Sequence, residues 1–471
     1  MNILRINFKW HKNAKKGIVT RLGEKYLSGE SFNFADVKSL FYPILLDQAF
    51  IAFIGIFNSS MISSSGAAAV SAVNMVDSLN MFLMNFFVAI ATGGTVVVAQ
   101  YMGRKDKSNA GHAAAQSILS STLAATVIAV LIIIFNKSVL HVLFGNADQE
   151  VMDNALIYLS GCCISYPFYA VFQSSMGALR GVGDSKASMF LSIVMNVLFL
   201  LGNVILIKFM SLGVYGIIIS LFIARGVGCI MALIYLLRVR TDLNIKVKQF
   251  FHLDLSLQKS ILYIGVPCAS EQLFFHGGKI ITQTFIVSLG LVSMTANAIS
   301  GSLSMMLNIP ENSILLCVVT IVGTCIGAGK IEEGKKFLKN MLITSSILTA
   351  LVCIVTIPFI PFLLGLYAPS PEIYDKAYEL MILYIAGAPI LLSFGFVFPG
   401  GLRAAGDAKY TSVIALLTMW MFRVTLGYFF GIVLKMDIFG VWLAMILEWG
   451  VRGFFFYIRY KGDKWYKHNF L

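Results

Sequence analysis

Charged residues are scarce in this chain. Only 13% of its 471 residues are Asp, Glu, Lys or Arg, whereas a soluble globular protein carries about 25%. Residues with apolar or aromatic side chains make up 58% of the chain. A water-soluble fold of this length would need far more polar surface. The composition therefore excludes a soluble globular protein, and it also excludes a disordered chain, a collagen and a small disulfide scaffold.

Cysteine and histidine are also few. The seven cysteines are an odd number and lie almost entirely in apolar runs, so we expect buried, inert thiols and neither disulfides nor a metal site. Of the six histidines, His276 alone lies deep in an apolar run, and one imidazole does not make a metal site. No GxxxxGK[ST] phosphate-binding motif is present. The sequence thus predicts no cofactor, no ATP chemistry and no enzyme.

The sequence consists mainly of long apolar runs. A helix needs about 20 apolar residues to cross a bilayer, and these runs are unbroken, unlike the alternating strands of a membrane β-barrel. We predict an all-α polytopic membrane protein with twelve transmembrane helices. They fall near residues 37–62, 68–100, 111–135, 153–176, 187–208, 212–237, 258–289, 292–326, 337–365, 376–400, 409–434 and 438–459.

The net charge of +13 follows a topological pattern. Basic residues gather in alternate links between the runs, as at Arg104, Lys105 and Lys107, while the other links carry acids such as Asp148 and Glu150. By the positive-inside rule, both termini of a multi-pass protein of the inner or plasma membrane should then be cytoplasmic. The basic charge therefore indicates contact with membrane lipids and no binding to nucleic acid.

An internal repeat is the strongest signal in the sequence. Pro43 aligns with Pro267 at an offset of 224 residues (267 − 43), and Asp47 aligns with Glu271 at the same offset. Gln48 with Gln272, Gly103 with Gly327, and LRGVGD at 179–184 with LRAAGD at 402–407 continue the series. Each half holds six predicted spans, so the halves are parallel repeats, an arrangement typical of secondary transporters that open a central site alternately to each side.

The repeat divides the chain into five predicted parts. These are a basic cytoplasmic segment at 1–37, a six-helix bundle at 38–237, a cytoplasmic linker at 238–257, a second six-helix bundle at 258–460 and a cytoplasmic tail at 461–471.

At these residues the chain resembles the multidrug and toxic compound extrusion (MATE) family, and its bacterial members in particular. The resemblance covers about 37–460. The motifs that carry it are ATGGTVVVAQYMG at 91–103, VVTIVGTCIGAG at 318–329, the two LRxxGD loops, LTMWMFRV at 417–424 and GVWLAMILEW at 440–449. The resemblance implies two six-helix bundles arranged as a V, and antiport coupled to H⁺ or Na⁺. One departure is Asn58, at a position where such members usually carry an aspartate; Asn neither titrates nor carries a charge.

Ionisable groups inside the predicted spans are candidate site residues, because each costs at least about 2.5–3.5 kcal/mol at a helix centre. Asp47 and Glu271 either handle ions or substrate, or pair with Lys or Arg to hold the bundles together. Lys279 should pair with a carboxylate, for which Glu271 or Asp77 would be within reach. Glu311 follows Pro310, where a kink is expected. The full set of candidates is Asp47, Asn58, Asp77, Glu271, Gln272, Lys279, Gln283 and Glu311.

The sequence therefore predicts a monomeric antiporter that exports organic, cationic compounds in exchange for H⁺ or Na⁺ by alternating access. The alternative on the same fold is a flippase or exporter of a lipid-linked or anionic substrate. A groove lined with several Arg and Lys would favour the anionic cargo, and paired acids would favour cations. Neither the substrate nor the coupling ion can be named from the sequence.

Overall fold

The computed structural model describes residues 18–62, 67–145 and 148–468, and every regular element in these ranges is a helix. The first half of the chain contains α1 (Ile18–Tyr26), α2 (Phe34–Ile62), α3 (Ala67–Gly103), α4 (Lys107–Ile134), α5 (Asn136–Phe144), α6 (Gln149–Gly181), α7 (Ser185–Asn203) and α8 (Gly213–Ile234). The second half contains α9 (Leu255–Ser288), α10 (Leu291–Leu307), α11 (Ile309–Gly327), α12 (Ile331–Thr356), α13 (Ile360–Gly365), α14 (Pro371–Gly387), α15 (Ser393–Ala404), α16 (Ala408–Thr418), α17 (Thr425–Tyr428) and α18 (Asp437–Lys461).

Short helical segments extend or connect these helices. Five are π-helical: η2 (Val204–Phe209), η3 (Tyr235–Val239), η7 (Ala388–Leu392), η8 (Met419–Val424) and η9 (Phe429–Val433). The 3₁₀ segments are η4 (Thr241–Leu243), η5 (Val247–Phe250), η6 (Ile357–Phe359) and η10 (Lys464–Tyr466).

Eleven helical stretches of the described residues are long and apolar enough to cross a membrane. The predicted seventh span, α9, is 34 residues long but is not among them, because Lys259, Glu271 and Lys279 interrupt its apolar sequence. The predicted span at 292–326 is two helices, α10 and α11, which are separated at Asn308. Pro310 follows that break, which is consistent with the expected kink because proline removes a helical hydrogen bond.

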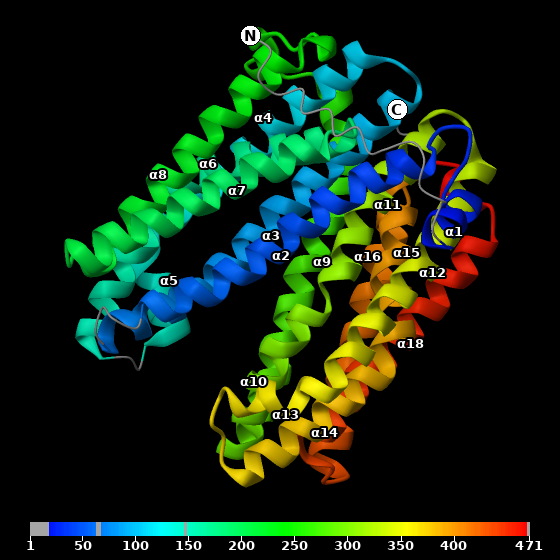
Figure 1. The fold of residues 1–471 in the computed structure, drawn as a ribbon. Coiled ribbons are helices and arrows are strands. Elements are labelled where there is room, and N and C mark those ends of the chain that lie inside the picture. Colours follow the sequence, from blue (N-terminus) through cyan, green and yellow to red (C-terminus); the bar gives the residue numbers. More distant parts are fainter. Residues whose placement is uncertain (1–17, 63–66, 146–147, 469–471) are drawn as a thin grey trace.

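The helices form two groups that meet at one end and diverge at the other, as predicted for a V-shaped fold (Figure 1). We call α2–α8 the first arm and α9–α18 the second arm. The ends of the described chain lie at the joined end, whereas α5 of the first arm and α13 and α14 of the second arm lie toward the open end.

The apolar cores explain this shape. At the open end each arm buries its own cluster, one around Phe87 and Tyr166 in the first arm and one around Met381 and Trp449 in the second. Three other clusters contain residues of both arms. At the joined end Leu40 of α2 is buried with the side chains of α11, α12 and α15, and residues of α3 are buried with residues of α9. Because only these shared clusters remove apolar surface of both arms from solvent together, the arms are held at that end and separate at the other.

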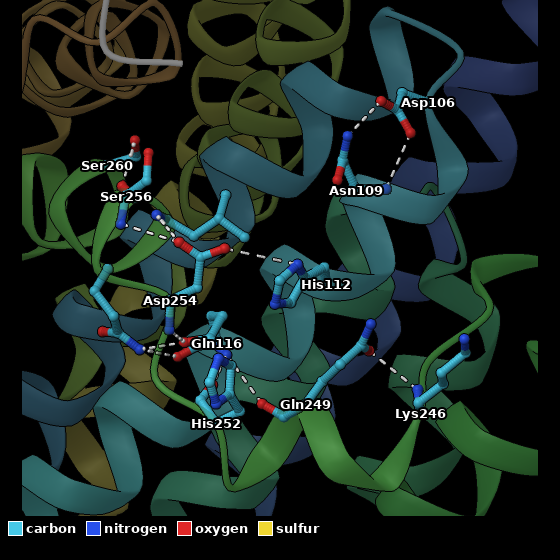
Figure 2. Close-up of polar contacts among 12 residues, drawn as sticks. Asp106, Asn109, His112, Gln116, Lys246, Gln249, His252, Asp254, Ser256 and Ser260 are labelled. Atoms are coloured by element: carbon cyan, nitrogen blue, oxygen red, sulfur yellow. Dashed lines mark hydrogen bonds and ion pairs between the residues drawn. The ribbon is translucent and has the colours of Figure 1, made fainter.

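Three hydrogen bonds of Gln116 fix the linker between α8 and α9 against α4 (Figure 2). The Gln116 side-chain amide donates to the carbonyl oxygens of Gln249 at 2.9 Å and His252 at 2.7 Å, and its Oε1 accepts from the backbone N–H of Asp254 at 3.2 Å. Asp254 in turn caps α9 by accepting from the backbone N–H of Ser256 at 3.0 Å. The start of the second arm is thus anchored to a helix of the first.

The segment between α1 and α2, residues 27–33, lies against the second arm, and we call it the N-terminal strap. Ser31 donates from its backbone N–H and its hydroxyl to the Glu333 carboxylate, at 2.7 and 2.8 Å. Lys336 donates to the carbonyl oxygen of Ser28 at 2.9 Å. Both partners of the strap belong to α12, so the strap joins the start of the first arm to the second arm at the closed end.

Candidate functional site

The two symmetry-related acids are each opposed by the arginine of an LRxxGD loop. Glu271 forms an ion pair with Arg403 at 2.6 Å and accepts from the Ser412 hydroxyl at 3.1 Å. Asp47 of α2 is only 5% exposed, and the charge of Arg180 acts on it. The ion pair of Glu271 corresponds to the structural pairing that was one of the two expectations. For Asp47 no ion pair is found among the described residues, and its Oδ1 has no hydrogen-bond partner there. The arginines were not expected to oppose these acids, although the LRxxGD motif repeats at nearly the same offset as the acids.

Asp77 lies in a different environment, at the centre of a neutral hydrogen-bond network in the first arm. Its Oδ1 accepts from the Tyr158 hydroxyl at 2.9 Å and from the Asn80 side-chain amide at 3.1 Å. Tyr166 donates to the Asn80 side-chain oxygen, and the charge of Arg225 acts on Asp77. Among the described residues Asp77 forms no ion pair, and its side chain is half-buried. It is therefore a carboxylate held by neutral donors.

Within the described ranges, Lys279 does not have the carboxylate partner that the sequence led us to expect. Its Nζ lies 5.0 Å from the centroid of the Phe275 ring, one helical turn earlier on α9. The charge that acts on Lys279 is that of Arg423 of η8, which is also positive. The expectation failed because the pairing of Glu271 with Arg403 removes one carboxylate, and Asp77 is engaged within the first arm.

Arg452 of α18 completes the surroundings of Phe275. Its Cζ lies 5.9 Å from the ring centroid, and that of Arg423 lies 5.6 Å from it. Arg452 forms an ion pair with Glu448 at 2.5 Å, four residues earlier on the same helix. Residues four apart on a helix are neighbours on its surface, so the two side chains can pair within α18. The grouping with Lys279 was not foreseen, because it arises from the packing of three separate elements.

The remaining candidates lie apart from this group. Glu311, in the first turn of α11, is 3% exposed, and its Oε1 has no hydrogen-bond partner among the described residues. Gln272 of α9 is half-buried and Gln283 is exposed. The side chain of Asn58 lies outside the part of the structure that is described. The candidate residues therefore do not converge on one site but divide between the arms.

Comparison with known proteins supports the repeat and the fold. The MatE family model matches the chain twice, at residues 43–205 and 267–429, which is the same offset of 224 (267 − 43). A transporter of Bacillus subtilis named as the uncharacterized transporter YisQ is 29% identical over 91% of this chain and 94% of its own length. A probable multidrug resistance protein of the same species, YoeA, is 22% identical over 80% of this chain and 82% of its own.

Solved structures have the same fold. An outward-facing multidrug resistance MATE family transporter superposes with a TM-score of 0.83 and 17% identity, covering 93% of this chain and 97% of that one. A MOP superfamily transporter from Pyrococcus furiosus, described as having a binding pocket of reverse polarity, superposes with a TM-score of 0.81 and 17% identity, covering 90% of this chain and 94% of that one. With a family match in both repeats and a shared twelve-helix fold, this chain belongs to the MatE family of multi-pass membrane transporters.

Proposed function

We propose that this chain is a secondary antiporter that exports organic compounds across the cell membrane in exchange for H⁺ or Na⁺. The observation that supports it is the division of the apolar core, shared between the arms at one end and separate at the other. Such a pair of repeated bundles can rock about the shared end, and this movement opens a central site to each side in turn. With both termini in the cytoplasm, as the positive-inside rule predicts, the V opens outward.

Asp77 is the carboxylate that best fits a coupling role. An exchanging site needs a group that can release its cation, and a carboxylate already neutralised by an ion pair is poorly suited to this. Glu271 and Glu448 are in ion pairs, whereas Asp77 is bound by the neutral donors Tyr158 and Asn80. We propose that H⁺ or Na⁺ binds at Asp77 and that this binding changes the balance between outward-open and inward-open states.

The names of the multidrug resistance relatives and the family resemblance favour drug-like organic cations as substrates, carried by a monomer. The second candidate on the same fold, an anionic or lipid-linked substrate, is favoured by one specific observation, the three cations around Phe275. Both candidates use the same alternating movement and differ in the charge of the cargo.

Transport by the purified protein in liposomes tests the proposal. We expect a pH gradient or a Na⁺ gradient, imposed separately, to drive uptake of an organic probe, and we expect an ionophore that collapses that gradient to stop it. Protein-free liposomes give the background rate. If a panel of organic cations and anions shows no gradient-dependent uptake above this background, the proposal is wrong.

A further inference from the structure

The three cations around Phe275 come from three elements that are distant in sequence. Lys279 lies on α9, Arg423 on η8 and Arg452 on α18, and the charged groups lie between 5.0 and 5.9 Å from the ring centroid. We call these residues, with Phe275, the cationic cluster. A single cation over an aromatic ring is a common contact. Three around one ring place like charges close together inside a membrane-spanning bundle, which is costly without an anion.

The cationic cluster is not neutralised by the described residues. Glu448 is its one carboxylate, and it is engaged with Arg452 at 2.5 Å. Neither Lys279 nor Arg423 forms an ion pair within the ranges that the structure describes. Three cations and one carboxylate leave a net charge of +2 at the cluster. Cations within membrane spans normally pair with acids or carbonyl groups, so this excess charge points to an anion that binds from outside the chain.

The local backbone favours a binding role over a purely structural one. Arg423 lies in the π-helical segment Met419–Val424, and a second π-helical segment, Phe429–Val433, follows in the same span. π-Helical turns are rare and occur often at functional sites. Gly278 of α9 leaves the space that Met419 occupies, since a Cβ there would lie 2.6 Å from the Met419 methyl carbon. The two elements that carry Lys279 and Arg423 are thus packed directly together.

Aromatic side chains accompany the charges. Phe396 lies under the Arg452 guanidinium at 5.1 Å, and Trp420 packs beside Gly277 of α9. The indole N–H of Trp420 has no acceptor among the described residues. Aromatic rings and Arg or Lys together provide contacts for a molecule that has both an apolar body and an acidic group.

We infer that the cationic cluster binds the acidic group of an amphipathic organic anion, a carboxylate, sulfonate or phosphate, while the neighbouring rings contact its apolar part. This inference selects the second candidate of the proposed function, the anionic cargo, and it rests on the proposed function for the role of the bound anion as cargo. The two arms then have different roles. The coupling cation binds at Asp77 in the first arm, and the cargo binds in the second arm.

Binding of an anion to the cationic cluster should also affect the movement of the arms. The Lys279 side chain is exposed in this structure. His276 on the same helix lies 3.5 Å from Asn85 of α3 in the first arm, which shows that the cluster is close to where the arms converge. When the arms rock together and cover this side chain, its uncompensated charge becomes more costly. An anion that neutralises the cluster lowers that cost, so the loaded transporter changes state more readily than the empty one.

The test is binding of two probes built on the same xanthene scaffold, the anion carboxyfluorescein and the cation rhodamine 123, to the purified full-length protein in nanodiscs. Fluorescence anisotropy measures both affinities. We expect carboxyfluorescein to bind, and Lys279→Gln and Arg423→Gln each to weaken its affinity about tenfold. Lys279→Arg should keep the affinity, because the charge remains. Lys208→Gln, which removes an exposed lysine in η2 of the first arm, is the matched control and should have no effect.

A second measurement uses the unmodified protein and does not depend on the folding of any variant. Unlabelled naphthalene-2-sulfonate should displace carboxyfluorescein, and the cation N-methylquinolinium should not. The inference is overturned if carboxyfluorescein does not bind, if its affinity is unchanged in a folded Lys279→Gln/Arg423→Gln variant, or if the cation displaces it as well as the anion does.

Transport distinguishes failure of the inference from failure of the proposed function. Gradient-driven uptake of rhodamine 123 without binding of carboxyfluorescein would leave the antiporter intact and remove the anion site. Binding of carboxyfluorescein that requires Lys279 and Arg423, without gradient-driven uptake of any probe, would keep the site and contradict the antiporter.

Discussion

Gly103 of α3 and Gly327 of α11 each lie against the backbone of the other's helix. A Cβ on Gly103 would lie 2.0 Å from the carbonyl oxygen of Thr324, and a Cβ on Gly327 would lie 2.1 Å from that of Gln100. Gln100 and Thr324 are themselves related by the offset of 224 (324 − 100), so the contact is symmetric. The two arms meet at their closed end through a pair of equivalent glycines.

Replacing either glycine should therefore loosen the closed end. We expect Gly103→Ala and Gly327→Ala each to destabilise the protein by about 1–3 kcal/mol, as overpacking does, and to lower the melting temperature in detergent. Gly301→Ala on α10 is the control, since a Cβ there meets nothing within 4 Å. Equal melting temperatures for all three variants would mean that the close approach does not hold the arms.

The ion pair between Glu271 and Arg403 should be structural. Glu271→Gln leaves the guanidinium without its anion, and breaking such a poorly hydrated pair costs about 3–5 kcal/mol. We expect a large fall in melting temperature, and partial recovery in the double variant Glu271→Gln/Arg403→Gln. If the single variant is as stable as wild type but loses its dependence on an ion gradient, Glu271 belongs to the coupling site instead.

Asp77→Asn should uncouple transport without unfolding the first arm. Asn retains an oxygen that can accept from Tyr158 and Asn80 but cannot take up H⁺ or balance Na⁺. We expect binding of the organic probe to persist and gradient-driven accumulation in liposomes to be lost. Asp153→Asn, at an exposed acid on α6, is the control. Wild-type dependence on pH and Na⁺ in the Asp77 variant would contradict the assignment.

Asp106, which lies outside the membrane spans, should make the start of α4 sensitive to acid. The backbone N–H and the side-chain amide of Asn109 donate to its carboxylate, at 3.0 and 2.7 Å (Figure 2), and they lower the pKa of Asp106 below its ordinary value of 3.8. A lowered pKa means that the cap stabilises α4 above pH 3.8 and that this stabilisation is lost as the pH falls through the lowered pKa.

Amide exchange of Asn109 measures this effect. We expect the protection of this amide, relative to intrinsic exchange at the same pH, to fall at low pH. Asp106→Ala should lose this protection already at neutral pH, since loss of such a cap costs about 0.5–2 kcal/mol. Exchange in the variant that matches wild type at neutral pH would show that the cap does not stabilise α4.

Cysteine labelling tests the orientation that the charge pattern predicts. All seven native cysteines are buried, and a cysteine-free background removes them altogether. A membrane-impermeant maleimide added to intact cells should label Asp148→Cys and should not label Ser108→Cys. The reverse result would place the termini outside the cell.

The repeat could be predicted from the sequence because equivalent residues keep a nearly constant spacing. The break between α10 and α11 was only partly predictable. Pro310 signals a kink, but α3, its counterpart, is continuous through Phe86, the equivalent position without proline. The cationic cluster could not be predicted, because the positions of Lys279 and Arg423 relative to one another depend on helix packing and on π-helical turns that leave no periodic signal. The arginines opposite Asp47 and Glu271 were partly predictable. The LRxxGD motif is visible in the sequence, but the sequence does not show that its arginine extends to the acid.

The N-terminal strap has a consequence for how the protein is made. Ser31 leaves the ribosome 302 residues before Glu333, its partner on α12. At translation rates of about 5–20 residues per second, the strap waits about 15–60 s for that partner. Because α2 to α11 are made between the strap and α12, the strap can dock only after these helices have been synthesised. The contact between the strap and α12 therefore forms late in the folding of the chain, although the strap itself is made early.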